Sequence, residues 1–351
     1  MSDMVDWNLA VATAARLAGG GPSVTFAEAA AVVTDLRRMT DESEIHVQDF
    51  THLTAQVDHP PVRVVDRADW ADVNVAGFRT VLTPLTEKLV SRQGAMPGAI
   101  TIAVGSRVAG LQVGGILAFL ASKVLGQYEV FSGAPGQLLL VAPNIVAAER
   151  SLDVDPHDFR LWVCLHEVTH RTQFTAVPWL RDHFLSEVSA FMDAADPDAM
   201  KDRLFSAVGQ VARAIRDLDT DVSIIDLVQT PAQKLILDRL TALMTLVEGH
   251  AEHVMNGVGP MVVPSVEAIH AKFQARRAGT GPFDRALRRL LGIDVKMKQY
   301  ADGSRFVAAV VEQVGMDGFN RVWTSPETLP TVAEISDAPA WIERVHGIHA
   351  S

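Results

Sequence analysis

The composition is that of a globular chain with an acidic balance. It has 351 residues, of which 48% are hydrophobic and 21% charged, and the formal net charge is −11. A chain of this length can bury a sizeable core, and its negative charge argues against a general attraction to nucleic acid or anionic lipid. The single cysteine, Cys164, excludes an intrachain disulfide, and the acidic N-terminus lacks the basic start of a secretory signal. We therefore expect a cytoplasmic protein.

The first 130 residues predict a series of helices. Residues 25–39 open with Thr25 and carry Glu28 three positions later, which is the pattern of a capping box. Residues 108–126, "VAGLQVGGILAFLASKVLG", approach the length of a membrane span, but Gln112, Ser122 and four glycines interrupt the run. We expect a buried helix after a glycine-rich turn, and no membrane partner.

A strand and then a long helix are predicted in the middle of the chain. Residues 136–145, "GQLLLVAPNI", are short, apolar and bounded by glycine and proline, as strands are. Asp155 is placed to cap the following helix, and Pro156 takes its first position, which proline favours. This helix should end before Pro178.

Helices are also predicted over residues 183–218 and from Thr230 onward. Thr230 and Gln233 have the spacing of a capping box, while Gly257 and Gly259 are placed to end that helix. The C-terminal part mixes helices with turns such as "ADGSR" (301–305) and "TSPETLPT" (324–331).

These segments predict a mainly α protein of the α+β kind, in which a small sheet has a large helical surround. No linker separates the parts, so we expect one elaborated domain over residues 1–351. Its N-terminal helical part covers about residues 1–130, its core about 131–260 and its C-terminal helical part about 261–351.

The segment "LWVCLHEVTHRTQF" (161–174) carries the chemistry. On a helix, His166 and His170 are one turn apart and share a face, so both imidazoles can bind one metal ion. Glu167 lies about 100° around the helix, where it can act on a metal-bound water without being a ligand. The alternative is a pair of partly buried histidines without a metal. The predicted strand before the capped helix favours zinc, because a sheet edge lies beside the metal in zincins.

Two glutamates are candidates for the third zinc ligand. Gln173 and Ala176 stand where a metzincin needs glycine and histidine, so that form is excluded. Glu187 follows the motif closely, and Glu248 lies much further on. We favour Glu248, because "VEGHAEHV" resembles a segment of gluzincin aminopeptidases whose first glutamate binds zinc, and Glu252 can support a ligand histidine one turn later.

Four segments together resemble a known family: "HEVTHRTQF", "LVEGHAEHVMN", "LLGIDVKMKQYADGSRFV" and "GMDGFNRVW". They are similar to an uncharacterised zincin-like family of actinobacteria and their relatives, whose members are assigned as zinc-dependent metalloproteases or hydrolases. One branch is associated with the biosynthesis of a deazaflavin coenzyme. The resemblance runs from about residue 60 to the C-terminus. It implies a mostly helical zincin-like fold with His166, His170 and Glu248 as the ligands.

Other residues are candidates for supporting roles. Tyr300 is a candidate donor to the oxyanion of a peptidase, with an amphipathic core tyrosine as the alternative. His250 and His253 lie on the far side of their helix if Glu248 faces the metal. Arg171 must turn away from the metal or pair with an acid, and Cys164 is expected to be buried.

Residues 270–300 form a local basic segment with eight lysines and arginines and two acids. Pairing with acidic helices of the same chain is one interpretation, and binding of a carboxylate or phosphate on a substrate is the other. Nucleic acid is not an expected partner, because few aromatic residues interleave with the basic ones.

The function expected from these residues is that of a zinc metallohydrolase of gluzincin type, in which Glu167 activates water to cleave a peptide. Two alternatives stay open. One is a catalytically inactive zincin-fold scaffold or binding protein. The other is an accessory protein of cofactor biosynthesis that binds a small molecule.

Overall fold

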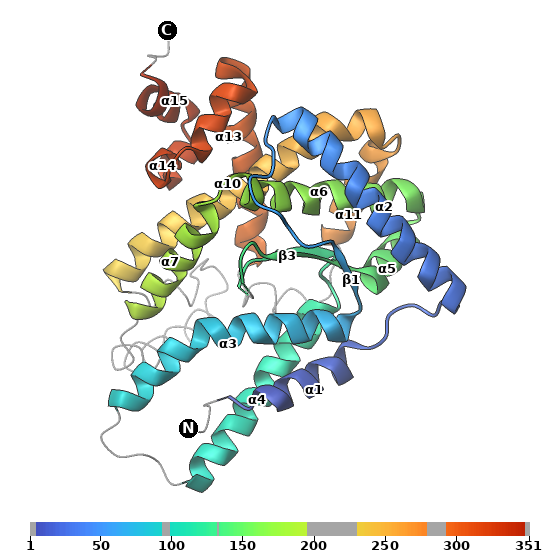
Figure 1. The fold of residues 1–351 in the computed structure, drawn as a ribbon, viewed down its shortest axis with the longest axis vertical. Coiled ribbons are helices and arrows are strands. Elements are labelled where there is room, and N and C mark those ends of the chain that lie inside the picture. Colours follow the sequence, from blue (N-terminus) through green and yellow to red (C-terminus); the bar gives the residue numbers. More distant parts are fainter. Residues whose placement is uncertain (1–4, 93–98, 132, 195–229, 279–292, 348–351) are drawn as a thin grey trace, which may run out of the picture. The chain divides into compact units, whose positions relative to one another are not determined.

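The computed structural model describes residues 5–92, 99–131, 133–194, 230–278 and 293–347 (Figure 1). Contacts between Cα atoms group the chain into two compact units. One holds Met1–Arg181 with Val254–Arg277, and the other holds Asp182–His253 with Ala278–Ser351. Helices dominate, and the described strands form one three-stranded sheet, as the predicted fold class requires.

Three helices pack together at the start of the first unit: α1 (Trp7–Ala18), α3 (Arg67–Arg92) and α4 (Ala99–Ala121). Two glycines let α4 approach α1 closely. A Cβ at Gly110 would lie 2.5 Å from the carbonyl oxygen of Asp6, and one at Gly114 would lie 2.6 Å from that of Ala10. Both glycines belong to the segment for which we predicted a buried helix. They lie on the face of α4 that packs against α1.

The other face of α4 is open. Val104–Ala121 has the length and hydropathy of a membrane span, yet only 28% of it is buried. A set of large apolar side chains on this helix is exposed: Val104, Val108, Leu111 and Ile116. The predicted helix therefore exists, but it is half-buried, and no glycine-rich turn precedes it in the described part of the chain.

The sheet is buried on both faces of its middle strand. Its order is β1 (Arg63–Val65), β3 (Gln137–Val141), β2 (Gly126–Glu129), with β1 parallel and β2 antiparallel to β3. Leu138 and Leu140 pack into the core that contains α2 and α6, whereas Leu139 and Val141 pack into the core that contains α1 and α4. Alternate side chains of a strand point to opposite faces, so β3 joins the two cores.

The predicted strand over residues 136–145 is therefore correct in place and too long. It ends at Val141, and α5 (Ala142–Leu152) begins at once, with Pro143 in its first turn. Proline is tolerated there because the first N–H groups of a helix have no partner within the helix. The sequence offered no polar turn at this point, which is why this helix was not predicted.

Helix α6 (Pro156–Ala176) begins and ends as predicted. The carboxylate of Asp155 accepts a hydrogen bond from the N–H of Asp158 at 3.0 Å, Pro156 takes the first position, and the helix ends before Pro178. It packs against α2 (Phe26–Thr51), which begins with the predicted capping box of Thr25 and Glu28. Nearly the whole of α6 is buried, so its side chains are held in fixed positions.

Helix α10 (Pro231–Val262) begins with the predicted capping box, in which Thr230 and Gln233 exchange hydrogen bonds of 3.0 and 3.1 Å. The predicted stop at Gly257 and Gly259 is wrong, because the helix continues through both. A Cβ at Gly257 would overlap the ring of Phe50, so this glycine lets the two chain segments approach. The following α11 (Val266–Ala278) completes the first unit.

The second unit is helical in its described part. It contains most of α7 (Leu180–Asp193) and of α10, followed by α13 (Ile293–Phe319). Four short elements end the chain: η1 (Asn320–Trp323), η2 (Pro326–Thr328), α14 (Val332–Ile335) and α15 (Ala338–His346). Of the predicted helix over residues 183–218, the part beyond residue 194 lies outside the described residues.

The turn predicted at 301–305 is wrong, because these residues continue helix α13. Gly303 is the reason. A Cβ there would overlap the carbonyl oxygen of Thr245, and Gly249 of α10 faces Gly303 in the same way. The glycine pair lets two helix backbones cross closely. The turn predicted over residues 324–331 is confirmed by η2 and its flanking bends.

Candidate metal centre

The two motif histidines face one another across one turn of α6. The Nε2 atoms of His166 and His170 are 3.2 Å apart, and their ring planes are nearly perpendicular, at 87°. Two nitrogens bound to one tetrahedral zinc ion at 2.0–2.1 Å lie about 3.3 Å from each other. The pair is therefore spaced as two ligands of one ion would be.

The outer ring nitrogens show which tautomer this arrangement favours. His170 Nδ1 lies 3.0 Å from Gln173 Oε1, and His166 Nδ1 lies 3.2 Å from the sulfur of Met255. An amide oxygen accepts hydrogen bonds, so the contact with Gln173 favours a proton on Nδ1 of His170 and a lone pair on its Nε2. A neutral imidazole in that tautomer can bind a metal ion through Nε2.

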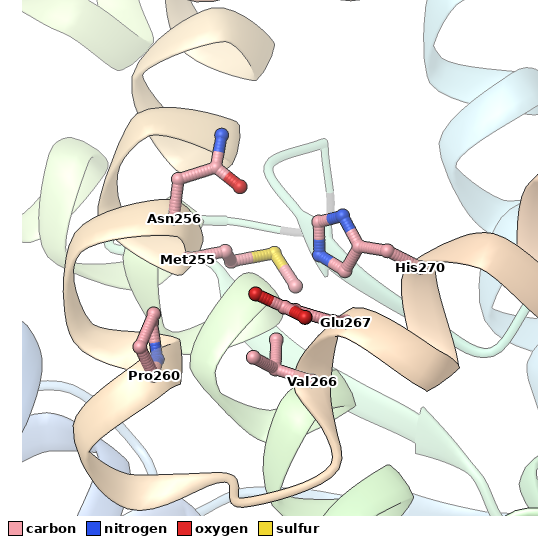
Figure 2. Close-up of a pocket in the computed structure, with 6 residues that line it drawn as sticks. All are labelled: Met255, Asn256, Pro260, Val266, Glu267 and His270. Atoms are coloured by element: carbon pink, nitrogen blue, oxygen red, sulfur yellow. The ribbon is translucent and has the colours of Figure 1, made fainter.

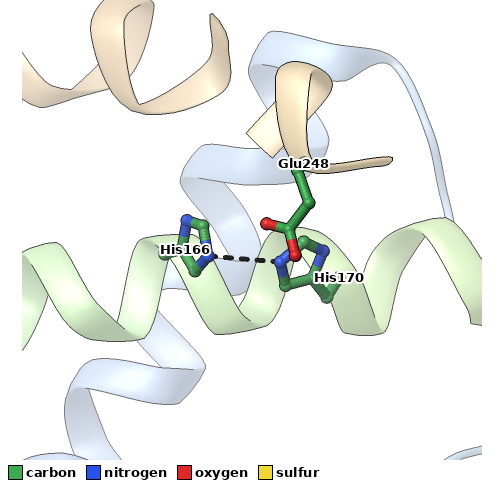
Figure 3. A group of neighbouring side chains, drawn as sticks. All are labelled: His166, His170 and Glu248. Atoms are coloured by element: carbon green, nitrogen blue, oxygen red, sulfur yellow. Dashed lines mark hydrogen bonds between the residues drawn. The ribbon is translucent and has the colours of Figure 1, made fainter. Parts of the chain in front are cut away.

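Glu248 completes the group (Figure 3). One ligand atom from each of His166, His170 and Glu248 lies within 4.8 Å of the others, and all three residues are half-buried. Glu248 precedes Met255 by seven residues on α10, so both occupy nearly one face of that helix, about 20° apart. The same stripe of α10 that contacts His166 through Met255 thus carries the glutamate. Two imidazole nitrogens and one carboxylate are a donor set that zinc prefers.

Glu167 lies outside this group of three. It is 7% exposed and packs against Gly126 on the edge strand β2. A Cβ at position 126 would lie 2.6 Å from Glu167 Cγ, so only glycine leaves room for the glutamate. Glu167 directly follows His166 in α6, and its role as a base stays a prediction.

Arg171, the residue after the second histidine, pairs with an acid as predicted. Its side chain is 3% exposed, and its Nη2 lies 3.1 Å from Glu44 Oε2. Burial lowers the pKa of the guanidinium, and the charges of Glu44 and Asp41 oppose this shift. The side chain of Arg171 is therefore held by Glu44 of α2, and it is not part of the group of candidate metal ligands.

Glu187, the other candidate for the third ligand, and the histidines that follow Glu248 on α10 have surroundings of their own. The Glu187 carboxylate forms an ion pair of 2.8 Å with Arg239. His250 is fully buried, and its ring stacks on Phe319 and meets Trp323 edge-on. Burial lowers the pKa of His253. Glu252 is half-buried one turn after Glu248, and its support of a ligand histidine stays a prediction.

Tyr300 lies on α13, and its side chain is outside the described residues, so its role as an oxyanion donor stays a prediction. In the basic segment 270–300, Lys272 donates a hydrogen bond of 2.5 Å to the carbonyl oxygen of Asp153, while the other basic side chains fall outside the description. Cys164 is fully buried, and burial raises the pKa of its thiol to about 12, so it is not a nucleophile.

Sequence reasoning missed three residues of the centre. Gln173 entered only as a mismatch to the metzincin pattern, although its position three residues after His170 places it on the same helical face. Gly126 had no local signal at all. Met255, finally, lines a cavity of about 370 Å³ together with residues of α11, among them Glu267 and His270 (Figure 2). Met255 thus contacts His166 Nδ1 with its sulfur and also lines this cavity.

Comparisons with known proteins identify the family of this chain. A family profile described as "Zincin-like metallopeptidase" matches residues 5–342. A crystal structure of a proposed hydrolase with a novel fold from Chloroflexus aurantiacus is 30% identical and superposes with a TM-score of 0.72, covering 97% of this chain and 99% of that one. Among curated proteins none matches. Because the family match spans nearly the whole chain, the protein belongs to the zincin-like metallopeptidase family.

Proposed function

We propose that the protein is a zinc-dependent hydrolase of gluzincin type that cleaves peptide bonds. The observation that carries this proposal is the convergence of His166, His170 and Glu248, with Glu167 beside them but outside the ligand group. Family membership supports a metallohydrolase in general, and the arrangement of these side chains supports the gluzincin form.

The division of work among the residues follows from their positions. His166, His170 and Glu248 would hold the ion, which supplies a Lewis acid and lowers the pKa of a coordinated water to about 7. Glu167 takes a proton from the attacking water and delivers it to the leaving amine. Gln173 keeps the proton of His170 on Nδ1, so its Nε2 would present a lone pair to the ion.

The edge strand β2 is placed to orient a peptide. In the described part of the sheet it pairs on one side only, with β3, and Gly126 at its start contacts Glu167. An extended peptide can add to such an edge through main-chain hydrogen bonds, which bring its carbonyl groups past the base. Tyr300 remains our candidate for the donor that stabilises the oxyanion.

Replacing Glu167 with glutamine tests the enzyme proposal. Glutamine has the same shape but cannot accept a proton from water, so we expect kcat against a peptide library to fall at least about 100-fold. Zinc content, measured by mass spectrometry of the metal, should stay unchanged because Glu167 is not a ligand. Glu312→Gln, the same exchange at an exposed position of α13, is the matched control and should cleave as the parent does.

Two results would contradict this proposal. Equal cleavage by the parent and by Glu167→Gln would assign the activity to another site. Zinc bound stoichiometrically with no cleavage of any peptide would favour the alternatives, a scaffold or an accessory protein of cofactor biosynthesis, for which the deazaflavin resemblance remains a prediction.

A further inference from the structure

A second cavity, of about 510 Å³, lies within the first unit. It is lined by residues of α2, of the segment before β1 and of α6: Arg37, Asp41, His59, Pro61, Val62 and Arg171. Neither the metal centre nor the proposed hydrolysis uses it. Its charged side chains carry the inference.

Arg171 brings a buried cation to this cavity. It is 3% exposed, and its described hydrogen bond is the one from Nη2 to Glu44. Both oxygens of Glu44 have partners, because Oε1 lies 3.2 Å from both His59 Nε2 and Gln48 Nε2. A guanidinium has five N–H donors in a planar fork, so most of those on Arg171 remain available to a ligand.

Arg37 and Asp41 add one charge of each sign. They are one turn apart on α2, both are exposed, and both line the cavity. Such a pair can form an ion pair across one turn. Among the described residues these two do not, although Arg38 and Glu42, with the same spacing one position further on, lie 3.1 Å apart. In the described part of the chain neither side chain forms a hydrogen bond or an ion pair, and Asp41 acts on Arg171 through its charge, so both can still meet a ligand.

The sum of charges decides what kind of ligand fits. Glu44 balances Arg171, and Arg37 balances Asp41, so the cavity has no strong net charge that would attract a simple anion. It offers guanidinium donors for a carboxylate and, a helical turn away, a carboxylate for an ammonium group. Pro61 and Val62 add apolar surface to the lining.

We propose that this cavity binds a small zwitterion with a carboxylate and an ammonium group, as in an amino acid or short peptide. The carboxylate meets Arg37 and Arg171, and the ammonium group meets Asp41. The proposal is independent of the metal. It goes beyond the proposed hydrolysis, because it assigns a second binding site to the chain.

Titration calorimetry with three matched probes tests it on the full-length protein. The probes are 4-aminobutanoate, butanoate and butylammonium, which share one carbon chain and differ only in their charged ends. We expect a dissociation constant of about 1 mM or tighter for 4-aminobutanoate, and binding at least about 10-fold weaker for each single-ended probe.

Surface variants locate the binding. Arg37→Gln and Asp41→Asn should each weaken the binding of 4-aminobutanoate about 10-fold, as expected for a lost charged hydrogen bond. Arg38→Gln, on the neighbouring position of α2, removes the same charge outside the cavity and should leave the affinity unchanged. All three positions are exposed, so the variants should fold.

Three results would overturn the proposal. Butanoate binding as tightly as 4-aminobutanoate would make the cavity a plain anion site. Binding that survives both cavity variants would come from elsewhere, for example from the metal centre. No heat of binding at about 10 mM of the zwitterion would show that the cavity takes no such ligand.

Discussion

At the scale of single residues, Gln173 has the clearest consequence. Its amide oxygen accepts from His170 Nδ1 at 3.0 Å, and it is fully buried. We expect Gln173→Leu to weaken zinc binding about 10- to 100-fold, because the ring loses the partner that fixes its tautomer. Gln173→Glu should restore or strengthen binding, since a carboxylate is the better acceptor. Competition with a chromogenic chelator measures both.

A purely structural role for Gln173 would give a different result. In that case both variants would lower the free energy of unfolding, while the zinc affinity of the folded protein would stay at the parent value.

The residues of the metal centre also show how much of the site can be predicted from the sequence. The spacing of His166 and His170 follows from the helical period, so their convergence was predictable. Met255 and Gly126 come from segments whose approach to α6 depends on packing, and nothing in their local sequence marks it. Glu248 was found only because its own segment resembled that of another zincin group.

At the scale of elements, the errors came from glycines. The sequence predicts a helix stop at Gly257 and a turn around Gly303, but each glycine lies inside a helix where a neighbouring segment comes close. In a sequence, a glycine can mark the end of a helix or a place where two helices cross closely. Only the tertiary contacts distinguish these two cases. The capped starts at Thr25, Asp155 and Thr230 were predicted correctly, because a cap is a local hydrogen-bond pattern.

Gly303→Ala tests this interpretation. A Cβ there would overlap the backbone of Thr245, which cannot turn away, so we expect the free energy of unfolding to fall by about 1–3 kcal/mol. Gly115→Ala in α4 is the control: a Cβ there meets nothing within 4 Å, so the change should stabilise by up to about 1 kcal/mol. Urea denaturation measures both. A stabilised Gly303→Ala would mean that the crossing of α10 and α13 is looser than described.

At the scale of the whole molecule, the metal would link positions that are far apart in the chain. A ligand that binds only the folded state raises its stability, by about 2.7 kcal/mol at a concentration 100 times its dissociation constant. We therefore expect added zinc to raise the melting temperature of the parent by several degrees. Glu248→Ala should abolish most of that rise, because two protein ligands remain.

Glu187→Ala is the comparison for this experiment. It removes the partner of Arg239 and no ligand, so the response to zinc should persist. If instead Glu187→Ala abolished the response and Glu248→Ala kept it, the third ligand would belong to α7.

The stripe that Glu248 and Met255 share on α10 has a consequence for how this chain can vary in length. Inserting or deleting one residue between them would turn the glutamate by about 100° relative to the methionine and carry it away from the histidines. Loops elsewhere tolerate such changes, but the seven-residue interval does not. Relatives that keep the site should therefore keep the spacing between this glutamate and this methionine. Their sequences should show H-E-x-x-H followed, at a variable distance, by E-x6-M. This pattern can be sought in sequences that are too divergent to align.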